Sequence, residues 1–228
     1  MMKLSIVMPV LDEAAGIEAA LAALAPFRQR GVEAIMADGG SRDGTPDLAR
    51  PLADRVLTAP RGRSHQMNAG AAAAAGDILL FLHVDTQLPD DADRLVLDGL
   101  VHSGRVWGRF DVRIDGGGML GLVAHMMNWR SRVTGIATGD QAMFVTRTAF
   151  ESVGGFPAIA LMEDVALSAK LKRIGKPLCL RASVATSPRR WRKHGTLRTV
   201  LLMWRLRVAY YFGADPAKLA KAYGYVEQ

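Results

Sequence analysis

Acidic residues occur at three places in the sequence where α/β proteins commonly carry catalytic or ligand-binding groups. Asp85 follows the apolar run at 78–82, Asp38 opens the loop Asp-Gly-Gly-Ser-Arg-Asp-Gly-Thr, and Glu163-Asp164 begins a helical pattern. A carboxylate at the end of a strand can bind a metal ion, a ribose or the edge of a base. A carboxylate elsewhere in the same cleft can take a proton from an attacking hydroxyl. The sequence therefore predicts a ligand-binding cleft edged by acids.

Each of these positions also has a structural explanation. Asp85 could open a turn or cap the next helix, and Asp43 and Thr45, later in the Asp38 loop, are expected to act as turn or cap residues. The helix dipole stabilises acids at a helix start, which would account for Glu163-Asp164. Arg61 and Arg63 precede another helix, where they could face a diphosphate or be solvated. The residues alone leave these alternatives open.

Alternating strands and helices must position the acids. Short apolar segments at 4–10, 32–37, 55–58 and 78–82 are separated by helical patterns. This order predicts a doubly wound, parallel sheet, and the uninterrupted run at 78–82 indicates a strand buried on both faces. Asp85 then lies at the carboxyl edge of the sheet, where such folds bind ligands.

The second half of the chain follows a different pattern. Residues 106–114 alternate and predict a half-exposed strand, and further strands are predicted at 141–145 and 177–184. Helices are predicted at 119–132 and 163–175 and over most of 196–223. In the first half, Pro26 is expected to help stop a helix that begins near Asp12.

Composition limits the classes of protein that fit. The net charge of +7 and pI near 9.9 call for an acidic partner, and charge alone admits nucleic acid, anionic lipid or a phosphorylated small molecule. One cysteine excludes an intrachain disulfide and a Cys-rich metal site. No apolar run approaches ~20 residues and the first residues lack the features of a signal peptide, so we expect a cytoplasmic protein.

Four segments together resemble the family 2 glycosyltransferases of GT-A fold: 8–13, 37–45, 82–85 and 163–164. Segments 66–70, 139–144 and 154–157 are similar to the branch of radical-SAM/selenodomain-associated, or arsenosugar-biosynthesis, transferases. The resemblance implies an α/β GT-A domain over 1–190, with a mostly parallel sheet flanked by helices. Its nucleotide half would span about 1–88 and its acceptor half about 89–190, followed by a basic helical tail at 191–228.

The family also implies a reaction and a set of site residues. A sugar would pass, with inversion, from a nucleotide-diphosphate sugar, UDP-sugar favoured, to an unknown hydroxyl acceptor. Asp38 would read the base, Asp85 would hold Mg²⁺ or Mn²⁺ on the diphosphate, and Asp164 would be the general base. The implied nucleotide contacts are Pro9, Leu11, Glu13, Asp38, Arg63, His83 and Asp85, and the implied acceptor contacts are Asp140 and Glu163.

The sequence departs from the family pattern at His83, where the first acid of the D-x-D motif is usual. An imidazole there could coordinate Mn²⁺ or hydrogen-bond the ribose or a backbone group. His194 could close a metal site from the C-terminal side or be a solvated residue. Two other functions stay open. One is a sugar-phosphate nucleotidyltransferase, which would require a Gly-rich loop with a basic residue at 9–13. The other is a catalytically silent membrane- or sugar-binding module.

The tail at 197–212 mixes Leu, Met, Trp and Tyr with Arg198, Arg205 and Arg207. Such a helix could lie on the anionic inner face of a membrane and present a hydrophobic or lipid-linked acceptor. It could equally pack on the domain or on a second subunit of a homodimer. Nucleic acid is not an expected partner.

Overall fold

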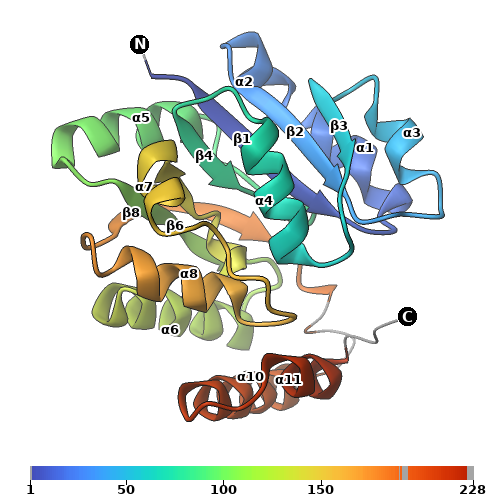
Figure 1. Cartoon of the computed structure of the whole chain (residues 1–228). Coiled ribbons are helices and arrows are strands. Elements are labelled where there is room, and N and C mark those ends of the chain that lie inside the picture. The colour runs from blue at the N-terminus through green and yellow to red at the C-terminus, as the bar shows by residue number, and fades with distance from the viewer. Residues whose placement is uncertain (1, 190, 192–194, 225–228) are drawn as a thin grey trace.

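A computed structural model describes residues 2–189, 191 and 195–224, and within them one eight-stranded sheet forms the centre of the molecule (Figure 1). The order of its strands is β3-β2-β1-β4-β7-β6-β8-β5. Their bounds are β1 Leu4–Val10, β2 Glu33–Asp38, β3 Arg55–Thr58, β4 Ile78–Phe81, β5 Thr86–Gln87, β6 Trp107–Ile114, β7 Phe144–Thr146 and β8 Leu178–Thr186.

The first half of the chain builds the parallel side of the sheet. β1 pairs in parallel with β2 and β4, and β2 pairs in parallel with β3. β7 joins the two halves as an antiparallel strand between β4 and β6, while β6 and β8 are parallel to each other. The predicted α/β fold with a mostly parallel sheet is confirmed, and so is the burial of β4 at every residue.

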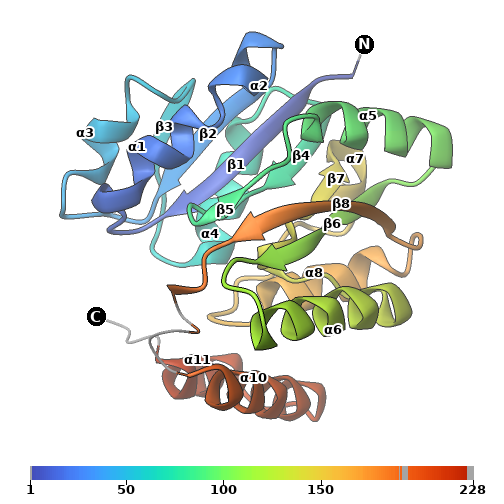
Figure 2. The ribbon, with the colours of Figure 1, turned by 180° about the vertical axis from the view of Figure 1, so that it is seen from behind.

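Helices cover both faces of the sheet, as Figures 1 and 2 show from opposite sides. The alternation of strand side chains divides the core in two: Ile6 and Met8 of β1 face one cluster and Val7 faces the other. The first cluster includes α1 Ala14–Ala22, α2 Ala25–Gln29, α3 Thr45–Ala49, α5 Ala92–Ser103 and α6 Met119–Thr134. The second includes α4 Arg63–Ala73, α7 Arg147–Ser152 and α8 Glu163–Leu171.

Strand β6 is buried almost throughout, so the prediction of a half-exposed strand was wrong. Two of its alternating polar residues, Arg109 and Asp111, are buried and form an ion pair, while Arg113 is exposed. The Arg109 guanidinium, fully buried, donates to the Asp111 carboxylate, which also accepts from Nη2 of Arg132 at 2.6 Å. In the sequence, a buried ion pair therefore gives the same alternation of polar and apolar residues as a strand with one solvent-exposed face.

Two predicted boundaries were also wrong. Pro26 lies in the first turn of α2 and starts that helix instead of stopping α1, because proline lacks only an N–H that the first turn leaves unpaired. The strand predicted at 141–145 begins at Phe144, since Gly139–Gln141 forms a 3-10 turn and Ala142 has a φ of 43°. That turn brings Asp140 to the same edge of the sheet as His83.

The tail forms helices α10 Thr196–Tyr211 and α11 Pro216–Tyr223, which lie beside each other below the sheet (Figures 1 and 2). Leu206 and Leu219 of these helices pack against Leu161 and Met162, the residues that precede α8. Packing on the domain, one of the two predicted arrangements, therefore accounts for one face of α10. None of the helices in the described ranges is long and apolar enough to cross a membrane.

Candidate active site

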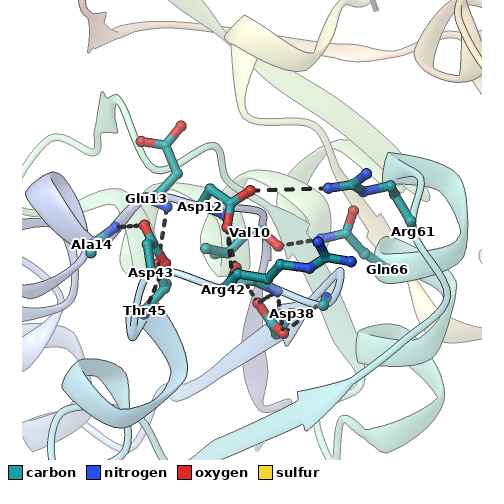
Figure 3. A network of polar contacts seen from close by, with 12 residues as sticks. Val10, Asp12, Glu13, Ala14, Asp38, Arg42, Asp43, Thr45, Arg61 and Gln66 are labelled. Atoms are coloured by element: carbon teal, nitrogen blue, oxygen red, sulfur yellow. Dashed lines mark hydrogen bonds and ion pairs between the residues drawn. The ribbon is translucent and has the colours of Figure 1, made fainter. Parts of the chain in front are cut away.

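Two loops at the carboxyl edge of the sheet are joined by hydrogen bonds between their backbones and side chains (Figure 3). Asp43 accepts from the Ala14 N–H at 2.9 Å, and the Thr45 hydroxyl accepts from the Glu13 N–H at 3.0 Å. These contacts supply acceptors to the free N–H groups at the start of α1. The Thr45 hydroxyl also donates to the Asp43 carboxylate. This hydrogen bond, followed by the one from the Ala14 N–H, lowers the pKa of Asp43. The predicted capping role of Asp43 and Thr45 is thus found, on α1 across the loop.

Asp12 fixes the other end of the same pair of loops. Its φ is 51°, its N–H donates to the Ser41 hydroxyl at 2.8 Å, and its carboxylate accepts from the Arg42 N–H at 2.8 Å. An oxygen of Asp12 also lies 4.0 Å from Nη2 of Arg61, as Figure 3 shows. The first and second loops therefore form one rigid rim.

Asp38 is the last residue of β2 and is almost completely buried. Its carboxylate accepts from the Gly40 N–H at 2.9 Å, the Ser41 N–H at 3.1 Å and the Ser41 hydroxyl at 2.5 Å. Because a carboxylate offers about four acceptor positions, one position can still face a ligand. Asp38 thus shapes the turn at the carboxyl edge of the sheet, and its contact with a ligand stays a prediction.

Gln66 of α4 holds the ends of β1 and β2 together. Its Nε2 donates to the Val10 carbonyl at 2.6 Å and to the Ala37 carbonyl at 3.0 Å. Gly39 passes directly beside this amide, since a Cβ there would lie 3.0 Å from Nε2 of Gln66. The sequence resemblance drew attention to the segment that contains Gln66, while the bond to both strands appears only in the fold.

The residues that the sequence predicted to contact the nucleotide lie around this rim. Pro9 pairs with Ala37 in the sheet, Leu11 is half-buried just after β1, and Arg63 is exposed at the start of α4. Partial burial and the nearby carboxylates of Asp85 and Asp43 raise the pKa of Glu13, although Arg189 and Arg63 act in the opposite direction. Glu13 and Asp85, from separate loops, therefore share one negatively charged region.

Asp85 follows β4 and is exposed. Its backbone carbonyl accepts from the Ser187 N–H at 3.1 Å, and no group in the described part of the chain donates to its carboxylate. Within that part, no cluster of three His, Cys, Asp or Glu side chains could hold a metal by itself. A free carboxylate with Glu13 nearby fits Mg²⁺ or Mn²⁺ that takes its remaining ligands from a diphosphate and water, as Mg²⁺ commonly does.

His83 lies between the two halves of the site. Its Nδ1 is 3.6 Å from the Asp140 carboxylate, and its ring covers Gly139 so closely that a Cβ there would be 2.6 Å from Nε2. Although burial opposes it, the nearby His83 imidazole lowers the pKa of Asp140. The position occupied by the first D-x-D acid in the family therefore carries a group that binds the acceptor-side turn.

Glu163 and Asp164 begin α8 and line a small pocket with His83, Gly139 and hydrophobic side chains. Asp164 Oδ2 accepts from the Gly139 N–H at 2.8 Å and Oδ1 from the Val165 N–H at 2.7 Å. Burial, followed by the charge of Asp164, raises the pKa of Glu163 to about 6. The hydrophobic lining is Met67, Phe81, Met143 and Phe156.

The structure thus brings His83, Asp140, Glu163 and Asp164 together, and groups Glu13, Asp38, Arg63 and Asp85 at the adjoining rim. Arg63 connects the two groups, since its charge lowers the pKa values of Glu13, Asp140 and Glu163 against the effect of burial. His194 lies outside the described residues. Sequence reasoning did not assign Arg207 and Tyr210 of α10 to the site, where the charge of Arg207 helps to lower the pKa of Asp140 and burial, followed by the charge of Asp164, raises the pKa of Tyr210.

A doubly wound sheet with its acids at this edge, followed by an antiparallel connection to a second acid pair, defines a GT-A-like glycosyltransferase fold. The family model described as glycosyl transferase family 2 matches residues 5–154. The chain therefore belongs to glycosyl transferase family 2.

One curated relative and several solved structures are similar to parts of the chain. The succinoglycan biosynthesis protein ExoA of Rhizobium meliloti (strain 1021) is 39% identical over 105 residues, 42% of this chain and 32% of that protein. The chain thus spans about a third of the length of this relative.

Among solved structures, S. aureus TarS 1-349 with UDP has a TM-score of 0.68 at 18% identity, over 82% of this chain and 60% of that one. The mannosyltransferase PcManGT from Pyrobaculum calidifontis, with GDP-Man and Mn²⁺, has a TM-score of 0.69 at 20% identity, over 98% and 69% of the respective chains. At these identities the likeness concerns the fold.

Proposed function

We propose that this chain transfers a sugar from a nucleotide-diphosphate sugar, with UDP-sugar favoured, to a hydroxyl acceptor with inversion at the anomeric carbon. One observation carries the proposal. The rim that holds Asp85 and the helix start that holds Asp164 belong to different halves of the chain, and His83 links them through Asp140 and Gly139. A displacement needs a leaving-group site and a base on opposite sides of one carbon, and this arrangement offers both.

On the donor side, Asp38 contacts the base and the loop containing Pro9, Leu11 and Glu13 borders the nucleotide. Arg63 binds the diphosphate, because its cationic side chain stands at the exposed N-terminus of α4, where backbone N–H groups also favour anions. Asp85 would hold Mg²⁺ or Mn²⁺, which when bound neutralises charge on the leaving diphosphate. The complexes of TarS with UDP-GlcNAc and of PcManGT with GDP-Man and Mn²⁺ support a donor and an ion of these kinds.

On the acceptor side, Asp164 takes the proton of the attacking hydroxyl. As that oxygen bonds to the anomeric carbon, the bond from the carbon to the diphosphate oxygen breaks. Each Asp164 oxygen has one recorded backbone donor and a further lone pair for the hydroxyl. Asp140 and Glu163 position the acceptor, and His83 holds the turn that carries Asp140. Glu163 is the poorer base assignment, because its carboxyl is more deeply buried than that of Asp164.

Two exposed apolar stripes support contact with a membrane surface. The members of each stripe recur at spacings of three and four residues, so they share one face of their helix. The stripe on α6 consists of Met119, Leu122, Met126, Trp129 and Val133. The stripe on α10 consists of Leu197, Leu201, Trp204, Val208, Tyr211 and Phe212.

Charge favours an anionic lipid surface over a second copy of the chain. Across the sequences of α6, α10 and α11, every charged residue is Arg or Lys. Arg198 and Arg205 are exposed and lie beside the α10 stripe at helical spacing. Two copies that met through these faces would bring like charges together, whereas anionic headgroups would attract them. We therefore propose peripheral contact with the cytoplasmic face of a membrane, with a homodimer as the competing outcome.

The donor is tested by titrating UDP, GDP and dTDP, and then their sugars, with Mg²⁺ or Mn²⁺ and with no metal. We expect UDP to bind more tightly with metal in the wild type, and this enhancement to be lost in Asp85→Ala. Equal enhancement in both proteins would remove Asp85 from the site. A nucleotidyltransferase would release pyrophosphate from a nucleoside triphosphate, and a silent module would bind a donor sugar without releasing nucleoside diphosphate.

The branch described as arsenosugar-biosynthesis transferases stays a prediction from segments 66–70, 139–144 and 154–157. Two of these segments meet in the fold: the Asn68 side chain donates to the Phe156 carbonyl at 2.9 Å and accepts from the Phe156 N–H at 3.0 Å. The third carries Gly139, which contacts both His83 and Asp164. This proximity supports a shared role at the acceptor pocket.

A further inference from the structure

Two arginines near the acceptor pocket have buried nitrogens without hydrogen-bond partners. In Arg130 of α6 these are Nε and Nη2, and in Arg207 of α10 the atom is Nε; none finds an acceptor in the described part of the chain. Burying an unpaired donor of a charged group is costly, and most buried polar groups are paired. An arginine kept in this state is a candidate for binding an anion that arrives with a ligand.

The two guanidinium groups are close enough to repel each other. Burial, and next the charge of Arg207, lowers the pKa of Arg130 to about 10, while Asp164 acts in the opposite direction. Asp164 does not neutralise the pair through recorded hydrogen bonds, because its carboxylate is bonded to the N–H groups of Gly139 and Val165. The free protein therefore holds two like charges beside the carboxylate that we assign as the base.

Packing fixes Arg207 at this place. Its neighbour Leu206 is buried against Leu161 and Met162, which lead directly into Glu163 and Asp164. One turn further along α10, Tyr210 belongs to the same cluster, and burial followed by the charge of Asp164 raises its pKa. The tail helix therefore packs directly on the segment that begins α8, next to Glu163 and Asp164.

We propose that Arg130 and Arg207 together bind a phosphate or carboxylate group of the acceptor beside Asp164. The proposal rests on the proposed function for the role of Asp164. Arginine suits this task because its planar fork donates two parallel hydrogen bonds to such a group. The same two helices carry the apolar stripes, so a lipid phosphate or a soluble phosphate ester could present the group, and these two sources share the chemistry that is recognised.

The test measures phosphate binding with the donor site filled. Inorganic phosphate, glycerol 3-phosphate and farnesyl phosphate are titrated by calorimetry into the protein saturated with UDP and Mg²⁺. We expect at least one of them to bind the wild type, and Arg130→Gln and Arg207→Gln each to weaken it about tenfold or more, the size of one lost charged hydrogen bond. Farnesyl phosphate binding more tightly than the soluble compounds would indicate a lipid source.

A matched control is Arg94→Gln, which removes the same charge from an exposed position of α5 and should leave phosphate binding unchanged. Thermal unfolding gives an independent readout: Arg130→Gln removes a buried unpaired cation, so its Tm should equal or exceed that of the wild type. Absence of phosphate binding to a wild type that binds UDP, an equal loss in Arg94→Gln, or a marked fall in Tm in Arg130→Gln would overturn the inference. Failure of UDP to bind would count against the proposed function. The phosphate affinities of the three variants would still test the present inference.

Discussion

Gly139 donates its backbone N–H to Oδ2 of Asp164 at 2.8 Å while its Cα faces the ring of His83. One residue thus orients the assigned base and touches the histidine that follows β4. Any side chain at this position would displace one of the two, because a Cβ would lie 2.6 Å from Nε2 of His83. The geometry of the pocket therefore depends on a glycine at 139.

Gly139→Ala should lower the rate of sugar transfer on the order of 10²-fold, since small displacements of catalytic groups have effects of this size. UDP affinity should change much less, because the donor rim does not contact Gly139. Steady-state transfer and UDP calorimetry measure the two effects. Gly121→Ala is the matched control: it lies in α6 with nothing within 4 Å of the added Cβ. Unchanged turnover in Gly139→Ala would mean that neither contact matters for catalysis.

Asp164→Asn should reduce transfer roughly 10²- to 10⁴-fold, the usual contribution of a general base. The amide keeps the shape of the side chain and can still accept a hydrogen bond, so UDP affinity and Tm should stay near the wild-type values. The product of the residual reaction, examined by NMR, should remain inverted. Wild-type turnover, or a product with the donor's anomeric configuration, would show that another group activates the acceptor.

Glu163→Gln tests the electrostatics of the same pocket. Burial and Asp164 raise the pKa of Glu163 to about 6, so its carboxyl is mostly neutral below pH 6 and becomes a destabilising charge as the pH rises through that value. The glutamine never acquires this charge. The variant should match the wild type at pH 4, below the ordinary carboxyl pKa of the unfolded chain, and exceed its Tm at pH 7.5, by a few degrees for a free-energy change on the order of 1 kcal/mol. Equal Tm values at both pH values would show that Glu163 titrates normally.

Leu201→Glu with Trp204→Glu should weaken binding to vesicles that contain anionic lipid, because both side chains belong to the exposed α10 stripe. Loss of two apolar contacts with a bilayer corresponds to at least about tenfold in partitioning. Val101→Glu, at an equally exposed apolar residue of α5, should have no effect. Vesicle flotation measures binding. If the wild type does not bind vesicles, but forms a dimer that the stripe substitutions dissociate, then the stripes contact a second copy of the chain.

The sequence predicted the parallel half of the fold well because its strands are short, mainly apolar segments separated by helical patterns. β4 is the clearest case, with four buried residues followed by His83 and Asp85. Local pattern was misleading where long-range pairing decides burial. Arg109 and Asp111 in β6 look like solvent-facing residues, and their burial depends on their contact with each other and with Asn128 and Arg132 of α6.

The candidate site was predictable in part for the same reason. Asp38, Asp85 and Asp164 follow or begin recognisable elements, so their positions could be expected from local sequence. Arg130 and Arg207 could not be placed, because only the fold packs α10 on the segment before Asp164 and brings the charges of Arg207 and Asp164 close to Arg130. A cationic residue in an apolar helix was their only signal, and surface residues give the same one.

The two hydrogen bonds between Asn68 and Phe156 bear on when the entropy of orienting the two sides of the site is lost. The side-chain amide of Asn68 pairs with the Phe156 backbone as a neighbouring strand would. These two hydrogen bonds connect α4, on the proposed donor side, to the loop that leads to Asp164. Orientation of donor and acceptor groups relative to each other is therefore established when the chain folds. Each turnover then needs to order only the two substrates, which is the condition under which bound reactants behave as if highly concentrated.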